Sequence, residues 1–410
     1  AINVGGLFFP QRVAMGMDSR KVTPKLASVV VHLAAEIRSF ARTEQTTDTV
    51  LTVKVSGSTI RRLAKEVGLE LADLDETDEL NADKESVVAE IAVVSCDGGR
   101  IRTRVPDNGR GVELSGENGW KEDKIASFER MDSNARHVEG VDPCPELPTS
   151  FRTVEKVAKI TEKRVLEVEL PNDPADERVV YEGPKRILRT TIGSMANSQK
   201  FGVKMLREAR RRQLLRARRR AFIADGLNWN WTIWEEHFSS FVPILDFIHA
   251  IEYVFTASDA LHTNDQDVWT SYTKYITLCW QGRVSAVIDE LTKACVTLGI
   301  DLDVGVEDDD RHKPITDAIR YLTNNQSRMN YPRYRRQGLP VTSSPMESLV
   351  KQINLRVKGT EMFWDDPDGA EAILQVRAAA LSDDGRLEDY LDKRPGYPFV
   401  RRTTPATAAA

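Results

Sequence analysis

Two short apolar runs in the middle of the chain each stop at an aspartate. Ala221–Ala224 leads into Asp225, and Phe241–Leu245 leads into Asp246. Short apolar runs bounded by turn-forming residues are typical of buried strands. A tryptophan-rich segment separates the runs, and His249 follows the second aspartate. The pattern predicts two strands that carry acidic side chains to a sheet edge, as the floor of an active site. The alternative is a βαβ segment whose aspartates cap helices.

A strand-rich pattern begins upstream, at Val87. The run 87–97 is apolar and β-branched, and the glycine pair 98–99 predicts a turn after it. Alternation over 101–105 predicts the second strand of a hairpin, and 120–128 supplies a third antiparallel strand. Asp97 is then expected at the end of the first strand of a meander. Alternatively, it is an ordinary turn residue before two glycines.

Helical periodicity covers much of the remaining chain. Thr23-Pro24 predicts an N-cap and first residue of a helix on which His32 is a partly buried histidine with satisfied hydrogen bonds. Ser58 is predicted to cap a basic helix over 59–68, and another basic helix is expected over 197–218. Further helices are predicted at 251–261, 269–280, 283–298 and 313–324, with a final helix opening at Glu347.

Length and composition narrow the class of protein. A chain of 410 residues favours two to three domains, and 41% hydrophobic with 29% charged residues fits a soluble globular protein. No apolar run reaches the roughly 18 residues of a membrane span, and no signal-peptide pattern opens the chain. The four cysteines show no CxxC pairing, which argues against a zinc finger or a disulfide scaffold. A cytoplasmic location is therefore expected.

Two basic stretches stand out against the net charge of −5. Lys204–Arg220 carries nine positive side chains and one glutamate, while Arg328–Arg336 interleaves arginines with tyrosines. Local clusters decide where a polyanion docks, and aromatic residues among cations can stack on bases. The alternative for each basic helix is a solvated surface helix. The residues predicted to contact DNA are Arg61, Arg62, Lys65, Arg211, Arg212, Arg328, Arg335, Arg336, Lys351 and Arg356.

Three carboxylates, Asp97, Asp225 and Glu347, are candidates for a shared metal centre. They lie far apart along the chain, so only the fold can bring them together. Two Mg²⁺ ions about 3.5–4 Å apart stabilise the entering and leaving oxygens of a phosphodiester transfer. Mg²⁺ prefers hard oxygen ligands, and carboxylates clustered without metal would repel each other. The pattern therefore predicts a site for two Mg²⁺ ions, with Mn²⁺ as a substitute.

Three stretches together resemble the ISKra4-type bacterial insertion-sequence transposases, over roughly residues 85–385. They are KRILRTTIGSMANSQKFG, RRAFIADGLNWNWTIWEEHFSSFVPILDFIHA and RMNYPRYRRQGLPVTSSPMESLVKQINLRVKGTEMFW. That family places its acidic residues in DGGR, ADG or GDG, and (V/M)ES contexts, which Asp97, Asp225 and Glu347 match. Mutator-like relatives add a (C/D)xxH element, matched by Asp246 and His249.

The resemblance implies a DDE transposase that cleaves element ends and joins a 3′-hydroxyl to target DNA. Asp97, Asp225 and Glu347 would bind the metals, and His249 would be a further catalytic residue. The implied fold is an RNase H-like mixed sheet flanked by helices, and the implied partner is double-stranded DNA, bound by a homo-oligomer associated with the nucleoid. The expected domains are a helix-turn-helix-like region at 1–80, the catalytic core at 81–249, an all-α insertion at 250–340, the final core helix at 341–390 and a disordered tail at 391–410.

Two other functional classes remain open from the sequence. A catalytically inactive or domesticated DNA-binding protein derived from a transposase would keep the basic surfaces and lose the chemistry. A glycosidase needs two carboxylates and no metal, but it leaves the basic clusters without a role. Binding that weakens steeply with salt separates the DNA-directed functions from the glycosidase.

Overall fold

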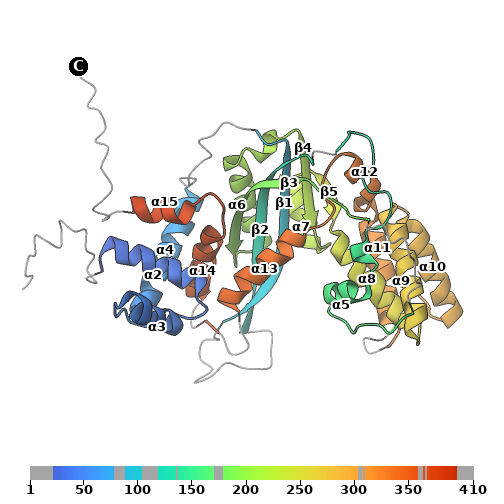
Figure 1. The fold of residues 1–410 in the computed structure, drawn as a ribbon, viewed down its shortest axis with the longest axis horizontal. Helices are drawn as coiled ribbons and strands as arrows, with labels where there is room; N and C mark the ends of the chain where they lie inside the picture. The colour runs from blue at the N-terminus through green and yellow to red at the C-terminus, as the bar shows by residue number, and fades with distance from the viewer. Residues whose placement is uncertain are drawn as a thin grey trace, which may run out of the picture.

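A five-stranded mixed sheet forms the centre of the protein, with helices on both of its faces and at both of its ends (Figure 1). The structure is a computed structural model, and it describes residues 22–77, 88–103, 119–134, 137–169, 179–302, 307, 310–358, 363–364 and 367–394. The strands are β1 (Ile91–Arg102), β2 (Trp120–Asp132), β3 (Lys185–Ser194), β4 (Arg219–Ala224) and β5 (Val242–Leu245).

Helices before, within and after the sheet complete the described part of the chain. The helices up to β5 are α2 (Pro24–Glu36), α3 (Phe40–Leu51), α4 (Gly57–Glu76), α5 (Val154–Thr161), α6 (Ser198–Arg211) and α7 (Asn228–His237). The later ones are α8 (Phe247–Leu261), α9 (Asp265–Trp280), α10 (Val284–Leu298), α11 (Lys313–Asn325), α12 (Tyr331–Arg336), α13 (Ser344–Val357), α14 (Pro367–Ala380) and α15 (Arg386–Lys393). In the described residues, no helix is long and apolar enough to cross a membrane.

The sheet has the strand order β3-β2-β1-β4-β5. The strands β1, β2 and β3 form an antiparallel meander, whereas β4 and β5 run parallel to β1. This mixed α/β architecture is compatible with an RNase H-like fold. The apolar runs 221–224 and 241–245 lie in β4 and β5, so the prediction of two strands that end at aspartates is confirmed.

The hairpin predicted around Gly98-Gly99 is wrong. β1 continues through both glycines to Arg102, and its antiparallel partner is β2. Gly99 pairs with Asp123, and a Cβ on Gly99 would lie 2.8 Å from Oδ1 of that aspartate. The glycine therefore permits a close approach across the strands rather than forming a turn. The strand expected at 120–128 is confirmed as part of β2.

Most predicted helices are present, with changes at their ends. The side chain of Thr23 caps α2, and the predicted helices between 251 and 324 correspond to α8, α9, α10 and α11. Ser56 rather than Ser58 caps α4, because the helix begins at Gly57, two residues before the predicted start. α6 ends at Arg211 instead of residue 218, since Gln213 adopts a left-handed conformation with φ 54°.

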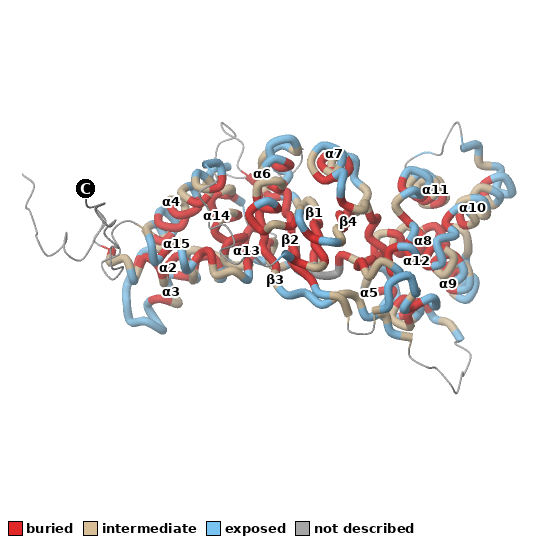
Figure 2. Tube along the Cα trace, turned by 90° about the horizontal axis from the view of Figure 1, so that it is seen from above, coloured by how far each residue is buried: buried red, intermediate tan, exposed pale blue. Residues whose placement is uncertain are grey.

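Buried side chains gather in two hydrophobic clusters, and Figure 2 shows buried residues throughout the sheet and in the helices at both of its ends. The first cluster joins the sheet to α5 through α12, and the second joins α2, α4, α13, α14 and α15. β1 takes part in both: Ile91 lies in the first and Ile101 in the second. α4 and α14 approach so closely that a Cβ on Gly68 would meet the backbone of Ala372 at 2.1 Å.

The predicted domain boundaries remain predictions, and two of them lie at or next to residues that the structure does not describe. The boundary expected at residue 80 lies outside the described residues, as does most of the tail expected at 391–410, but residues 391–393 belong to α15. His32 is part-buried and contacts the carbonyl oxygen of Ser28 and the carboxylate of Glu388, as expected for a satisfied histidine.

The two faces of the sheet carry different helices. Side chains alternate between the faces along a strand. Cys96 of β1 contacts Asn230 of α7 on one face, whereas Ile101 and Ile125 join the cluster of α13 on the other. α13 crosses in front of the strands in Figure 1. Asp97, one residue after Cys96, therefore points to the face that α13 covers.

Candidate active site

Three aspartates follow the residues at which the parallel pairing of β1, β4 and β5 stops. The register aligns the residue before Asp97 with the residue before Asp225, and the latter with the residue before Asp246. The backbone N–H of Asp246 also donates to the carbonyl oxygen before Asp225, at 2.9 Å. Because the three aspartates are level in this register, they lie side by side where β4 and β5 end, next to the middle of β1.

The negative charge of Asp225 makes ionisation of Asp97 less favourable. Burial, followed by the negative charge of Asp225, raises the pKa of Asp97 to about 6. Burial also raises the pKa of Asp225, although the amide of Leu227 and the charge of His249 partly oppose this. The backbone N–H of Gly98 donates to Asp97 Oδ1 at 2.6 Å. A divalent cation would offset the repulsion and the desolvation cost of two partly buried carboxylates on adjacent strands.

Asp225 is held in place by two residues that sequence reasoning missed. Asn230 is buried, donates to Asp225 Oδ1 at 2.5 Å and accepts from the Cys96 thiol at 3.2 Å. The Tyr321 hydroxyl donates to the backbone carbonyl of Asp225 at 2.5 Å. Gly226 has φ +97°, and a Cβ there would lie 2.9 Å from the Tyr321 ring. Gly226 of the ADG motif therefore permits both the positive φ and the close approach of Tyr321, and Asn230 follows the motif on α7.

Asp246 is a helix cap and also the partner of His249. Its fully buried carboxylate accepts from the amides of Ile248 and Ser343 at 3.1 and 3.0 Å and from the Ser343 hydroxyl. His249 Nδ1 lies 3.2 Å from Asp246 Oδ2. Burial opposes both charges, but the mutual hydrogen bond outweighs it, so the pKa of His249 rises to about 10 and that of Asp246 falls. At neutral pH the two form an ion pair, and protein donors occupy both oxygens of Asp246.

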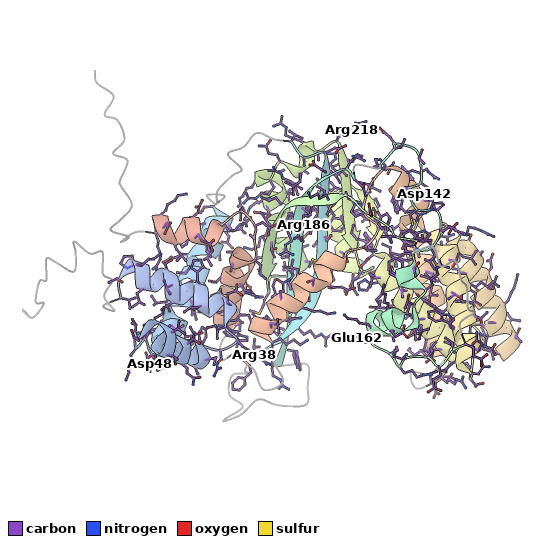
Figure 3. All side chains as sticks on the ribbon, viewed as in Figure 1. Arg38, Asp48, Asp142, Glu162, Arg186 and Arg218 are labelled. Carbon is purple, nitrogen blue, oxygen red and sulfur yellow. The ribbon has the colours of Figure 1, made fainter. Side chains whose placement is uncertain are left out.

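Glu347 lies in the first turn of α13, near enough to Asp246 and His249 for their charges to shift its pKa. Burial and the charge of Asp246 raise its pKa, and Lys351 lies 4.0 Å away. Glu252 of α8 and Glu162 at the end of α5 also contribute negative charge, and Figure 3 labels Glu162 by α5. Within the described residues, no three or more His, Cys, Asp or Glu side chains are grouped closely enough to hold one metal ion.

A cavity of about 580 Å³ opens beside Asp225, between α7 and α11. Its lining includes Gly226, Trp231, Tyr321 and Arg328, together with other polar side chains. The Arg328 guanidinium lies 4.3 Å from the centre of the Trp231 ring, and Tyr321 stacks on Tyr253 at 3.7 Å. The cavity reaches the residue after Asp225, and its lining combines aromatic faces with two arginines and two carboxylates.

Six of the residues predicted to contact DNA lie at least partly at the surface. Arg61, Arg62, Arg336 and Lys351 are exposed, and Lys65 is half-buried on α4. The sixth, Arg328, is partly buried against the Trp231 ring as described above. These positions are compatible with DNA contact but do not test it.

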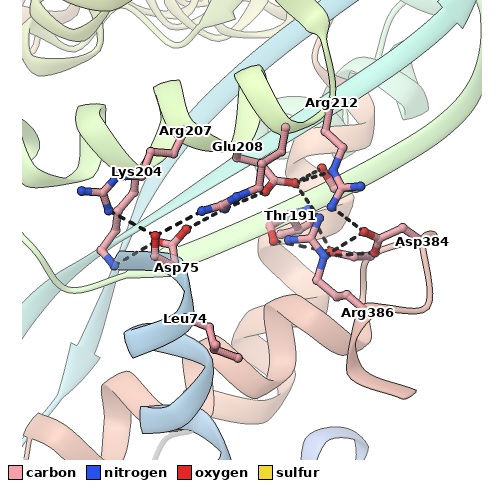
Figure 4. A network of polar contacts seen from close by, with 12 residues as sticks. Leu74, Asp75, Thr191, Lys204, Arg207, Glu208, Arg212, Asp384 and Arg386 are labelled. Carbon is pink, nitrogen blue, oxygen red and sulfur yellow. Dashed lines mark hydrogen bonds and ion pairs between the residues drawn. The ribbon is translucent and has the colours of Figure 1, made fainter. Parts of the chain in front are cut away.

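The structure contradicts the surface position predicted for Arg211 and Arg212. Both side chains are buried in an ion-pair network that joins α4, α6 and the start of α15 (Figure 4). Arg211 pairs with Asp75 at 2.8 Å, and Arg212 pairs with the fully buried Glu208 at 3.0 Å. Burial opposes the charge of Glu208, but Arg386 and Arg212 hold its pKa well below the usual range. Part of the basic run therefore stabilises the fold.

Arg335 and Arg356 are also buried rather than exposed. Arg335 forms two hydrogen bonds to Asp142 and stacks over a tryptophan ring. Arg356 on α13 donates to the carbonyl oxygen of Ala34, between two aromatic rings. The run of positive charges does not itself indicate which side chains are buried, because their hydrogen-bond and ion-pair partners come from elements that are distant in sequence.

Comparisons with known proteins leave the family open. No protein-family model matches the chain, and no curated protein matches it. A solved structure with a similar arrangement is the Drosophila P element transposase strand transfer complex. The likeness has a TM-score of 0.34 and 10% sequence identity, and it covers 92% of this chain and 96% of that chain. A TM-score this low does not assign a shared fold.

Proposed function

We propose that this protein is a DDE transposase of the ISKra4 type, which cleaves DNA strands at the ends of an insertion sequence and transfers them to target DNA. The observation that carries the proposal is the alignment of Asp97 and Asp225 on adjacent strands, with the pKa of Asp97 raised to about 6 by burial and by Asp225. Two partly buried carboxylates this close together destabilise the fold when no cation is bound, and they suit a metal-dependent phosphodiester transfer.

The donor set fits magnesium. Mg²⁺ usually keeps several waters and takes one or two carboxylates together with phosphate oxygens of the substrate. Asp97 and Asp225 would supply those carboxylates, and Glu347 would join them if α13 shifts when DNA binds. When bound, the metal would supply charge neutralisation at the attacking and leaving oxygens.

The remaining groups position the reaction. Asn230 and Tyr321 fix the carboxylate and backbone of Asp225. The His249 imidazolium, held by Asp246, presents a positive charge at the same edge of the sheet and would orient a phosphate oxygen. Glycosidase chemistry would require two carboxylic acids on opposite sides of a sugar, whereas Asp97 and Asp225 are neighbours on adjacent strands.

The exposed cations give a DNA path that is consistent with this chemistry. Lys351 lies one turn beyond Glu347 on α13, and Arg61 and Arg62 lie on α4 in the neighbouring cluster. Surface cations of this kind contact phosphates and fix the position of a duplex without reading its sequence. The cavity beside Asp225 would receive the strand next to the scissile phosphate.

The test is strand cleavage of a plasmid that carries the sequences flanking the coding region, in Mg²⁺ and in Mn²⁺. Asp225→Asn is expected to abolish cleavage while DNA binding, measured by anisotropy, remains. The matched control is Asp289→Asn, which alters an exposed carboxylate on α10 and should leave cleavage unchanged. Metal-dependent cleavage retained by Asp225→Asn would remove the assignment.

One outcome selects the alternative function. Salt-dependent binding of the flanking DNA by the native chain, with no cleavage in either metal, would indicate a catalytically inactive DNA-binding protein derived from a transposase. Homo-oligomer formation on DNA belongs to the same proposal and is measured by light scattering of the complex.

A further inference from the structure

A second cavity lies away from the carboxylate pair, where α3, α4, α13 and α14 meet. Its volume is about 280 Å³. Among the described residues, four cationic and three aromatic side chains line it, and no acidic one does. They are Arg61, Arg62, Lys65, Arg356, Phe40, Phe363 and Trp364. The composition favours a ligand that has both a negative charge and a flat apolar body.

Arg356 forms the inner wall of this cavity and is only 1% exposed. Its guanidinium donates to the carbonyl oxygens of Ala34 and Arg38, at 2.5 and 3.4 Å. Its Nη2 atom has no hydrogen-bond partner in the described structure. Burial, and then the charge of Arg377, lowers the pKa of Arg356 to about 10. In the described structure this buried cation has two carbonyl oxygens and two aromatic rings as partners and no carboxylate, so an anion from outside would stabilise it.

The aromatic residues give the cavity a flat surface at its mouth. Trp364 is 7% exposed and is fixed by its Nε1–H, which donates to the carbonyl of Val357 at 3.0 Å. Phe363, the adjacent residue, is 41% exposed. A large exposed ring beside several cations is the arrangement that proteins use to stack an unpaired base while holding its phosphate.

We infer that this cavity binds a single unpaired nucleotide, with the base on Phe363 and the phosphate toward Arg62 and Arg356. The volume lies just below the roughly 300–1,000 Å³ of small-molecule sites, which suits one nucleotide rather than a longer segment. The nucleotide is either free or an unpaired residue at a DNA end. Only the second source rests on the proposed function.

The first experiment measures the affinity of dAMP by ligand-observed NMR, with deoxyadenosine and inorganic phosphate as separate probes. Phe363→Ala and Arg62→Glu change exposed residues and should each raise the Kd of dAMP about fivefold or more. Lys293→Glu reverses an exposed charge on α10 and should leave the Kd within about twofold of the native value. Arg356→Met serves as a third variant, after its folding has been checked by circular dichroism.

The second experiment separates the two sources by comparing a blunt DNA duplex with one that has a single unpaired 3′ nucleotide. Tighter binding of the overhang, lost in Phe363→Ala, assigns the cavity to a DNA end. Binding of dAMP without an overhang effect assigns it to a free nucleotide. The inference is overturned if dAMP shows no saturable binding, if Phe363→Ala and Arg62→Glu leave its Kd unchanged, or if inorganic phosphate binds as tightly as dAMP. Asp225→Asn should retain dAMP binding, so failed cleavage and failed nucleotide binding are distinguishable.

Discussion

Replacing Asp97 by asparagine should stabilise the metal-free protein at alkaline pH. The pKa of Asp97 is raised from 3.8 to about 6, and each pKa unit corresponds to about 1.4 kcal/mol. The ionised carboxylate therefore lowers the free energy of unfolding by at most about 3 kcal/mol above pH 6, and by about 1–3 kcal/mol once partial exposure is allowed for. Asparagine keeps an oxygen that can accept from the Gly98 amide and removes the charge.

The sign of the pH dependence follows from the folded state binding the proton more tightly than the unfolded chain. Between about pH 4 and pH 6 the native protein loses stability as pH rises, whereas the variant lacks this term. The advantage of Asp97→Asn should be complete at pH 8 and roughly half as large at pH 5. Urea unfolding followed by circular dichroism at the two pH values measures both quantities.

The control and the response to metal make the test specific. Asp289→Asn, on the surface of α10, should change the free energy of unfolding by less than about 0.5 kcal/mol at either pH. Mg²⁺ should stabilise the native protein at pH 8 and stabilise Asp97→Asn much less, because binding to the folded state adds to its stability. A variant no more stable than the native protein at pH 8, or an advantage that is equal at both pH values, would refute the electrostatic account.

Three further predictions concern packing and the buried ion pairs. Gly226→Ala should destabilise the protein by about 1–3 kcal/mol in thermal unfolding, because φ is +97° and the Cβ would lie 2.9 Å from Tyr321; Gly299→Ala, also at positive φ but with open space around it, isolates the conformational part. Gly68→Ala should separate α4 from α14, since its Cβ would lie 2.1 Å from Ala372, and hydrogen exchange in α4 should rise; unchanged exchange would contradict this packing. Glu208→Gln should lower the free energy of unfolding by about 3–5 kcal/mol, because it removes the buried negative charge that three buried arginines share and leaves them only Asp75 and Asp384; a loss below about 1 kcal/mol would show that the network is dispensable.

The sequence predicted the strands of the site better than it predicted their extent. Apolar runs that stop at Asp225 and Asp246 are local signals, and both strands were found where the runs lie. The glycines after Asp97 have the same local appearance as a turn, yet they allow β1 to continue beside Asp123. β1 continues through these glycines because it pairs with β2, which begins about 20 residues after it ends. The spacing of residues around Asp97 does not reveal that pairing.

Buried cations were the other limit of sequence reasoning. Arg211 and Arg62 occur in similarly basic, amphipathic helices, but only Arg211 meets a carboxylate from another element. Asn230 and Tyr321 support Asp225 through contacts across 5 and 96 positions. Contacts of this kind depend on tertiary packing, so no pattern in a single sequence identifies them.

The packing of α4 against α14 has a consequence for how the chain folds during synthesis. Gly68 and its contact at Ala372 are separated by about 300 residues, which a ribosome takes roughly 15–60 s to make at roughly 5–20 residues per second. For that interval the part of α4 that packs against α14 has only α2 and α3 beside it, and the contact with α14 closes only when translation is nearly complete. Ribosome-bound chains should therefore depend on chaperones far more than the finished protein does when it refolds from denaturant.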